Sequence, residues 1–148
     1  MSTSEDTMQL MERFIGAFEG SERPQGAERE EWIAMWAEDA VWECPLMPQP
    51  FRLEGREQIC TFMLWMMDAS PEYRVIEKIV FPSADENEVF VEARGDGPVD
   101  GGGRYTQHYI VHFRTSGGKI VHVREFLSPI AVFNGFGEER INAAFAAF

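Results

Sequence analysis

The spacing of hydrophobic residues changes along the chain, and it predicts the order of helices and strands. Between residues 5 and 18, apolar side chains recur at intervals of three and four, which predicts an amphipathic helix. A second helical pattern covers residues 27–37, and residues 36–43 have the pattern of a helix end, an aspartate turn and a first strand. A short strand is expected over residues 51–54, and a third, almost wholly apolar helix begins at residue 55.

The second half of the chain predicts a succession of strands. Residues 73–81 and 88–94 are rich in β-branched and aromatic side chains, as is the hairpin of residues 104–129. Residues 95–103 hold five glycines and a proline, which predicts a mobile loop that acts as a flap. Residues 138–148 suggest a short closing helix. It is expected either to cover a cavity or to bind a partner.

This order of elements predicts an α+β fold, in which an antiparallel or mixed sheet carries a layer of about three helices on one face. A strongly curved, cone-shaped sheet wrapped around helices leaves a cavity, and ligands favour such apolar concavities. The length of 148 residues fits a single domain over residues 1–148.

One carboxylate in the last strand departs from the apolar pattern. Alternation places Glu125 on the same face as Val121, Val123 and Leu127. A carboxylate among apolar side chains either finds a hydrogen-bonding partner or stays protonated, and both outcomes suit acid–base chemistry. The alternative is that Glu125 only reaches the rim of the sheet, since Pro129 follows closely.

The turn of the hairpin decides which residues share the face of Glu125. An odd number of loop residues places Glu125 on the same face of the sheet as Tyr105, whereas an even number places it on the face of His108. A bulge could bring His108 to the face of Tyr105. His108 is therefore kept as a third catalytic candidate, although a lone strand histidine is more often structural.

Composition excludes several classes of function. The chain has 25 acidic and 13 basic side chains and a formal net charge of −12, which disfavours binding to nucleic acid or to anionic membranes. The two cysteines, Cys44 and Cys60, lack metal-ligand or redox spacing, and no histidine spacing suits a metal. No apolar run is long enough to span a bilayer and no signal peptide is present, so a cytoplasmic location without metal or cofactor is expected.

Several short motifs stand out along the chain, among them residues 36–42 (WAEDAVW), 103–108 (GRYTQH), 117–120 (GGKI) and 124–126 (REF). Together they resemble the SnoaL-like branch of the nuclear transport factor 2-like superfamily, most closely the phenazine-biosynthesis A/B proteins. The resemblance implies that Glu125 is the acid–base group and that Tyr105 lines the same pocket. That family also uses an arginine, a histidine and a serine, whose places here are taken by Trp32, Phe62 and Met66. This loss argues against a carboxylated phenazine substrate.

The leading hypothesis is an enzyme that performs proton-transfer chemistry, such as isomerisation, cyclisation, condensation or dehydration, on a small apolar, polyketide-like or aromatic ligand. Glu125 would act as the acid or base, and Tyr105 would donate a hydrogen bond to a substrate oxygen. The expected substrate-binding residues are Trp32, Trp36, Trp42, Phe62, Trp65 and Met66. The alternative is a non-catalytic domain for ligand binding or dimerisation. Apolar residues on both faces of the central strands also predict a homodimer.

Overall fold

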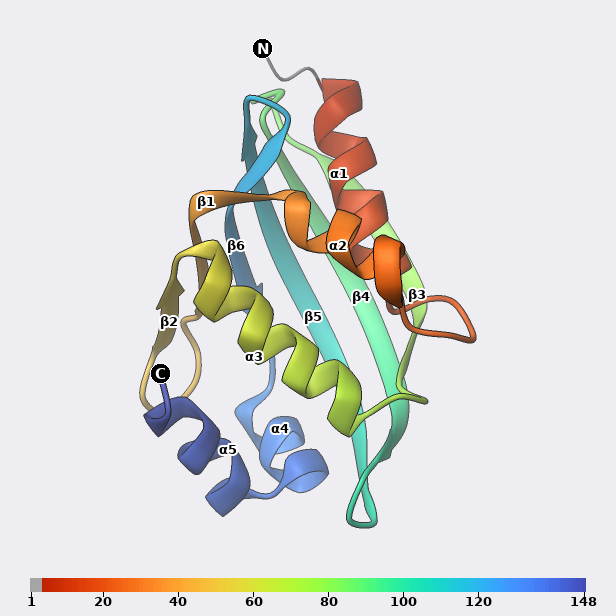
Figure 1. The fold of residues 1–148 in the computed structure, drawn as a ribbon, viewed down its shortest axis with the longest axis vertical. Coiled ribbons are helices and arrows are strands. Elements are labelled where there is room, and N and C mark those ends of the chain that lie inside the picture. The colour runs from red at the N-terminus through yellow and green to blue at the C-terminus, as the bar shows by residue number, and fades with distance from the viewer. Residues whose placement is uncertain (1–3) are drawn as a thin grey trace.

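The computed structural model describes residues 4–148, which form one mixed sheet and five helices (Figure 1). The elements follow one another as α1 (Ser4–Gly16), α2 (Gly26–Ala34), β1 (Trp36–Cys44), β2 (Phe51–Glu54), α3 (Arg56–Ala69), β3 (Arg74–Pro82), β4 (Glu88–Val99), β5 (Gly103–Ser116), β6 (Lys119–Phe126), α4 (Pro129–Phe136) and α5 (Glu138–Ala146). The strand order is β2-β1-β6-β5-β4-β3, and only β1 and β6 pair in parallel. The predicted α+β class is confirmed.

The helices lie on one face of the sheet, and α3 crosses it diagonally (Figure 1). This face carries the core because alternate side chains of β4 and β5, among them Val89, Val91 and Phe113, are fully buried there. In α3 the buried residues include Ile59, Phe62 and the methionines at 63 and 67. No helix of residues 4–148 has the length and hydropathy needed to cross a membrane.

The second helix ends earlier than its apolar pattern predicts. Helix α2 stops at Ala34, and Trp36 already pairs with Ile120 of β6. The backbone N–H of Ile120 donates to the carbonyl of Met35 at 2.8 Å, so pairing with β6 replaces a further helical turn. The expected helix end at residues 36–37 is therefore the beginning of a strand.

The hairpin between β5 and β6 combines an even loop with a bulge. Gly117 and Gly118 both have positive φ, 57° and 75°, as a two-residue hairpin turn requires. A bulge then shifts the register, because Thr115 pairs with Ile120 whereas Arg114 pairs with His122. The even loop alone would place the Glu125 side chain on the same face of the sheet as His108. The extra residue moves it to the opposite face, where Glu125 pairs with Val111.

The prediction of a loop over residues 95–103 is wrong. Strand β4 continues to Val99 and pairs with β5 as far as Gly103, leaving a turn of three residues. The glycines serve close packing instead. A Cβ on Gly97 would lie 2.3 Å from Cα of Tyr73, and one on Gly103 would lie 2.1 Å from the carbonyl oxygen of Gly135.

Candidate functional site

A largely enclosed cavity lies between the sheet and the helices. Its wall is mostly apolar, and it includes nine aromatic rings, which come from Phe14, Phe18, Trp42, Phe62, Tyr73, Tyr105, Tyr109, Phe136 and Phe145. The space open to the centre of a water molecule is about 80 Å³. One water needs roughly 10–15 Å³ by this measure, so the cavity has room for several waters or for a small organic molecule.

Glu125 is the charged residue of the cavity wall. Strand β6 presents it on the face that it shares with Val111, and its uncovered surface faces the cavity. The indole N–H of Trp42 donates to Oε2 of Glu125 at 2.7 Å. Burial raises the pKa of Glu125 from 4.5 to about 7, although the hydrogen bond from Trp42 acts in the opposite direction. The predicted apolar setting of this carboxylate is confirmed, and near neutral pH it can both accept and release a proton.

The three tyrosines of the chain meet in this cavity. The hydroxyl oxygens of Tyr73 and Tyr109 lie 2.5 Å apart, and the Tyr109 hydroxyl donates to that of Tyr105 at 3.4 Å. The rings of Tyr73 and Tyr105 stack, with centroids 5.1 Å apart. Burial raises the pKa of all three phenols, so they stay protonated and can serve as hydrogen-bond donors.

The remaining wall offers little other polarity. Ser70 donates its hydroxyl to the carbonyl of Met66 at 2.7 Å, within its own helix end. Burial raises the pKa of the Cys44 thiol, which therefore stays protonated and a poor nucleophile. No arginine, lysine or histidine of the described residues lines the cavity. A ligand that carries a carboxylate would find no cation there to compensate its charge.

The structure brings five of the predicted site residues to the cavity wall, namely Glu125, Tyr105, Trp42, Phe62 and Met66. Phe62 and Met66 are one helical turn apart and face the same way. Trp65, next to Met66, does not line the cavity. Its half-buried ring packs behind two wall residues, with centroids 5.8 Å from Phe62 and 6.1 Å from Phe136, and the guanidinium of Arg140 lies 5.4 Å from it.

The other two predicted tryptophans belong to the core rather than to the cavity. Trp32 stacks on Phe14 with ring centroids 5.6 Å apart, and Trp36 packs edge-on against the same ring at 5.7 Å. Both are buried, so the sequence pattern of Trp32 and Trp36 correctly indicates burial but not contact with a ligand. Phe14 separates them from the cavity, since it lines the wall itself.

His108 is not brought to the site. The bulge that turns Glu125 toward Tyr105 leaves His108 on the opposite face of β5, where its side chain is 52% exposed and lies 3.7 Å from Glu92. Sequence reasoning in turn missed Tyr73, which stands just before β3. Tyr109 was not among the predicted site residues either, although alternation places it on the same face of β5 as Tyr105.

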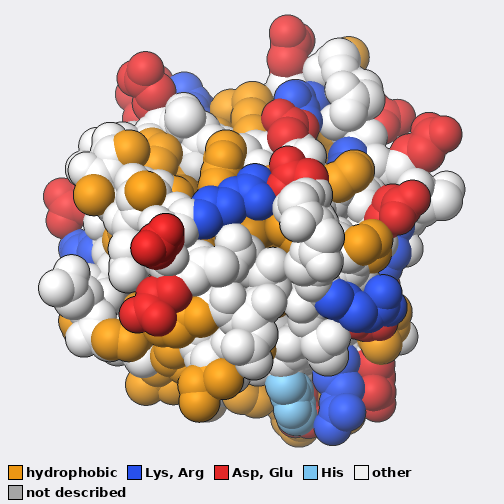
Figure 2. Space-filling view, turned by 90° about the horizontal axis from the view of Figure 1, so that it is seen from below, with side chains coloured by type: hydrophobic (Ala, Val, Ile, Leu, Met, Phe, Trp, Pro, Cys, Tyr) orange, Lys and Arg blue, Asp and Glu red, His pale blue; other side chains and the backbone are white. Residues whose placement is uncertain are grey.

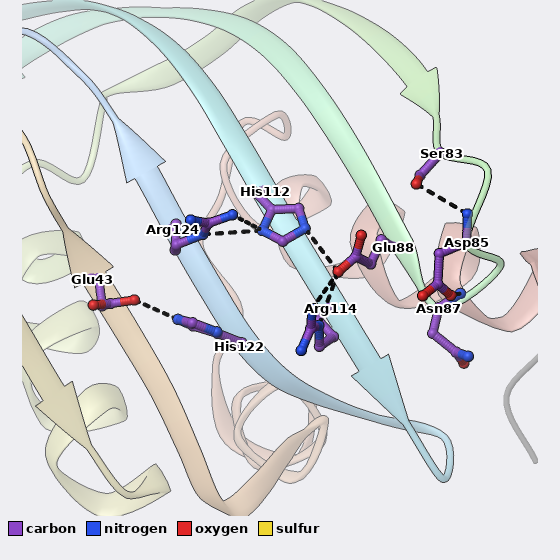
Figure 3. Close-up of polar contacts among 9 residues, drawn as sticks. All are labelled: Glu43, Ser83, Asp85, Asn87, Glu88, His112, Arg114, His122 and Arg124. Carbon is purple, nitrogen blue, oxygen red and sulfur yellow. Dashed lines mark hydrogen bonds and ion pairs between the residues drawn. The ribbon is translucent and has the colours of Figure 1, made fainter.

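The other two histidines belong to a polar cluster on the outer face of the sheet, opposite the helices (Figure 3). Nδ1 of His112 accepts a hydrogen bond from Arg124 at 3.0 Å, and His122 lies 2.5 Å from Glu43. Burial, together with nearby Arg124, lowers the pKa of His112. Within residues 4–148 no group of three or more His, Cys, Asp or Glu side chains could hold a metal ion.

Comparison with known proteins places this geometry in a family. The SnoaL-like domain model matches residues 11–123. The uncharacterised protein YesE of Bacillus subtilis is 34% identical over 109 residues, which make up 72% of this chain and 74% of YesE. The phenazine biosynthesis protein PhzA2 of Pseudomonas aeruginosa is 27% identical over 139 residues, 89% of this chain and 85% of PhzA2.

Solved structures agree with this result. A proposed isomerase from Bacillus subtilis matches with a TM-score of 0.75 and 28% identity, over 93% of this chain and 96% of that protein. A protein of Anabaena variabilis described as NTF2-like matches with a TM-score of 0.67 and 20% identity, over 85% and 89% of the two chains, which identifies the fold alone. The chain therefore belongs to the SnoaL-like family and has the nuclear transport factor 2-like fold.

Proposed function

We propose that this protein is a cofactor-independent acid–base enzyme that acts on a small, neutral, largely apolar ketone of polyketide-like or aromatic type. The observation that carries the proposal is Glu125, a carboxylate with a pKa of about 7 on the wall of an otherwise apolar cavity. A group with this pKa is suited to act as base and then as acid at neutral pH. The similarity to a proposed isomerase and to a phenazine biosynthesis protein supports this class of chemistry.

The proposed reaction is a proton transfer next to a carbonyl group. The C–H bond beside the carbonyl breaks, its proton passes to Glu125, and its electron pair forms a carbon–carbon double bond while the π pair of the carbonyl moves onto the oxygen. A phenol of the tyrosine group stabilises the resulting enolate by donating a hydrogen bond. Glu125 then returns the proton to another carbon, which gives isomerisation, or first exchanges it with solvent and returns a solvent proton to the same carbon, which gives exchange. Oε2 accepts from Trp42, and Oε1 has no partner within residues 4–148, so Oε1 is the oxygen assigned to the proton.

A neutral substrate follows from the charges of the wall. The resemblance to phenazine-biosynthesis proteins places Phe62 and Met66 where that family has polar side chains, and both line the cavity here. A ligand carboxylate in this cavity would have no cation to compensate its charge, and ionised Glu125 would repel it. We therefore propose a substrate class different from that of the phenazine proteins.

The test uses deuterium exchange into 2-tetralone, a neutral bicyclic ketone with acidic C–H bonds beside its carbonyl. We expect the protein to accelerate the exchange in D₂O, as followed by NMR, and Glu125→Gln to reduce the acceleration roughly 10²–10⁴-fold. Glu77→Gln, which changes an exposed carboxylate on β3, is the matched control. Saturable binding of 2-tetralone without accelerated exchange would favour the alternative of a binding domain.

A further inference from the structure

Gln107 is a buried amide beside the tyrosine group, with 3% of its surface exposed. Its Oε1 accepts hydrogen bonds from the backbone N–H groups of Ser128, at 3.0 Å, and His108, at 3.1 Å. Its Nε2 donates to the carbonyl of Ser128 at 3.0 Å and to the hydroxyl oxygen of Tyr105 at 3.1 Å. An amide has two acceptor positions and two protons, so all of its hydrogen-bonding capacity is used.

These partners determine the orientation of the amide. The two backbone N–H groups can only donate, so the atom facing them must be the oxygen of Gln107. The opposite orientation would set its NH₂ group against both donors and its oxygen against the carbonyl of Ser128. The group that meets Tyr105 is therefore N–H, which cannot accept the phenol proton of Tyr105.

The direction of the hydrogen bonds then continues through the tyrosines. The Tyr109 hydroxyl donates to the oxygen of Tyr105, and the short contact to Tyr73 lets Tyr73 donate to Tyr109 in turn. Tyr105 thus receives two hydrogen bonds, while its own proton has no acceptor among residues 4–148. Donation to a hydroxyl oxygen polarises its O–H bond and makes that hydroxyl a better donor.

Gln107 also connects this donor to the cover of the cavity. Ser128 is the N-cap of α4, and its Oγ accepts from the backbone N–H of Ala131 at 3.2 Å. Helix α4 contributes Val132 and Phe136 to the cavity wall, and the ring of Phe136 packs edge-on against Tyr105 at 5.0 Å. The amide therefore holds the phenol and the start of this helix in one arrangement before any ligand binds.

We propose that Gln107 is a positioning residue that directs the Tyr105 hydroxyl proton into the cavity as the hydrogen bond to a ligand's carbonyl oxygen. This inference rests on the proposed function, because it names the oxygen-binding half of the same site. It assigns the carbonyl oxygen of the ligand to Tyr105 and the adjacent C–H bond to Glu125.

The test is the infrared carbonyl stretch of 2-tetralone labelled with ¹³C at the carbonyl and bound to the protein. A hydrogen bond lowers this frequency, so Tyr105→Phe should raise it. Gln107→Glu should raise it as well, since an ionised carboxylate keeps the acceptors for Ser128 and His108 but takes the proton of Tyr105 for itself. Gln58→Glu, on the exposed side of α3, adds the same charge elsewhere and should leave the frequency unchanged.

Catalysis and folding give separate readouts. Gln107→Glu should reduce the exchange rate about tenfold, in line with the loss of one hydrogen bond of about 1–1.5 kcal/mol. Denaturant unfolding shows whether each variant is folded. Gln107→Leu, which removes the amide without adding a charge, should raise the carbonyl frequency less than Tyr105→Phe. An unchanged frequency in both Tyr105→Phe and Gln107→Glu overturns the positioning role, even if Glu125→Gln still slows the exchange. The positioning role is also overturned if the carbonyl frequency responds to Tyr73→Phe instead of Tyr105→Phe, or if 2-tetralone does not bind.

Discussion

The indole N–H of Trp42 donates to Oε2 of Glu125 at 2.7 Å, and the two residues lie on the neighbouring parallel strands β1 and β6. The hydrogen bond occupies one carboxylate oxygen and leaves the other facing the cavity. It also stabilises the charged form of Glu125, which burial disfavours. Trp42 therefore moderates the pKa of the proposed base and sets its orientation.

Trp42→Phe should raise the pKa of Glu125 further, by roughly one to two units, because a hydrogen bond to a charged group contributes about 1.5–3 kcal/mol. The measurement is a ¹³C NMR titration of the Glu125 carboxyl carbon. Trp36→Phe is the matched control, since the indole nitrogen of Trp36 is buried without a hydrogen-bond partner within residues 4–148. An unchanged pKa in Trp42→Phe would show that this hydrogen bond does not tune the base.

The raised pKa of Glu125 also predicts how stability depends on pH. The pKa is about 7 in the folded chain and 4.5 as its ordinary value, so between these pH values only the folded chain keeps the proton. The free energy of unfolding should therefore fall as pH rises toward 8, by on the order of 2 kcal/mol from this residue. Urea unfolding of the wild type and of Glu125→Gln at pH 5 and pH 8 isolates the effect. The contributions of other titrating groups, such as His112, cancel when the two proteins are compared. An equal change in unfolding free energy between pH 5 and pH 8 in both proteins would contradict the raised pKa of Glu125.

The residues of the last hairpin show what the sequence could and could not predict. The place of Glu125 among apolar side chains follows from alternation, but its face depends on one bulge. The extra residue in β6 lies between Ile120 and His122, and no composition signal distinguishes it from an ordinary strand residue. The resemblance to a family supplied the correct face, which pattern and loop length alone left open.

Other errors arose where packing between distant segments overrides a local pattern. Residues 95–103 have the composition of a loop, yet residues 95–99 and Gly103 pair as strands, and Tyr73 and Gly135 pack against them. The tryptophans at 32, 36 and 65 are apolar in the same way as Trp42, and only the tertiary arrangement decides which of them reaches the cavity. The meeting of Tyr73 with Tyr109 likewise depends on the pairing of β3 with β4 and of β4 with β5.

Gly97→Ala should destabilise the protein by about 2–3 kcal/mol, because the added methyl group would lie 2.3 Å from Cα of Tyr73, a backbone atom that cannot easily move. Gly16→Ala, at the end of α1 with nothing within 4 Å of the added carbon, should be neutral or slightly stabilising. Thermal and urea unfolding compare the two variants. Equal stability of Gly97→Ala and the wild type would contradict the close packing of β4 on Tyr73.

We propose that the outer face of the sheet, opposite the helices, pairs in a homodimer. Its exposed apolar residues include Ile79, Phe81 and Ile110, with exposed fractions of 47%, 49% and 39%. Cross-strand pairing through Glu92 places Ile79 and Ile110 in one row, and Ile110 continues to Phe126. Such a row on one face is typical of an interface.

Light scattering at micromolar concentration should therefore give about twice the chain mass of 16.9 kDa. Ile110→Arg should shift the protein to the monomer, because a charge would be buried at the interface. Ile130→Arg, which changes a residue of α4 that is 71% exposed and does not belong to this row, should leave the dimer intact. A monomeric wild type would refute the proposal.

Helix α5 covers the cavity and separates it from an outer hollow at this end of the molecule, where hydrophobic side chains gather among charged ones (Figure 2). Phe145 lines both spaces, and its ring stacks on Phe51 with centroids 3.6 Å apart at 9°. The ring therefore forms part of the partition between the two spaces. We expect ligand entry to require displacement of the Phe145 ring.

Phe145→Ala should join the cavity to the outer hollow and accelerate ligand entry and release together, about tenfold each, with little change in the dissociation constant, since a gate affects the barrier for both directions. The change should also cost about 1–3 kcal/mol of stability, as expected for a half-buried aromatic ring. Stopped-flow tryptophan fluorescence with 2-tetralone measures the rates. Phe148→Ala is the control, because Phe148 contacts Phe62 at 5.7 Å but lines neither space. Rates that change equally in both variants, or in neither, would place the entry route elsewhere.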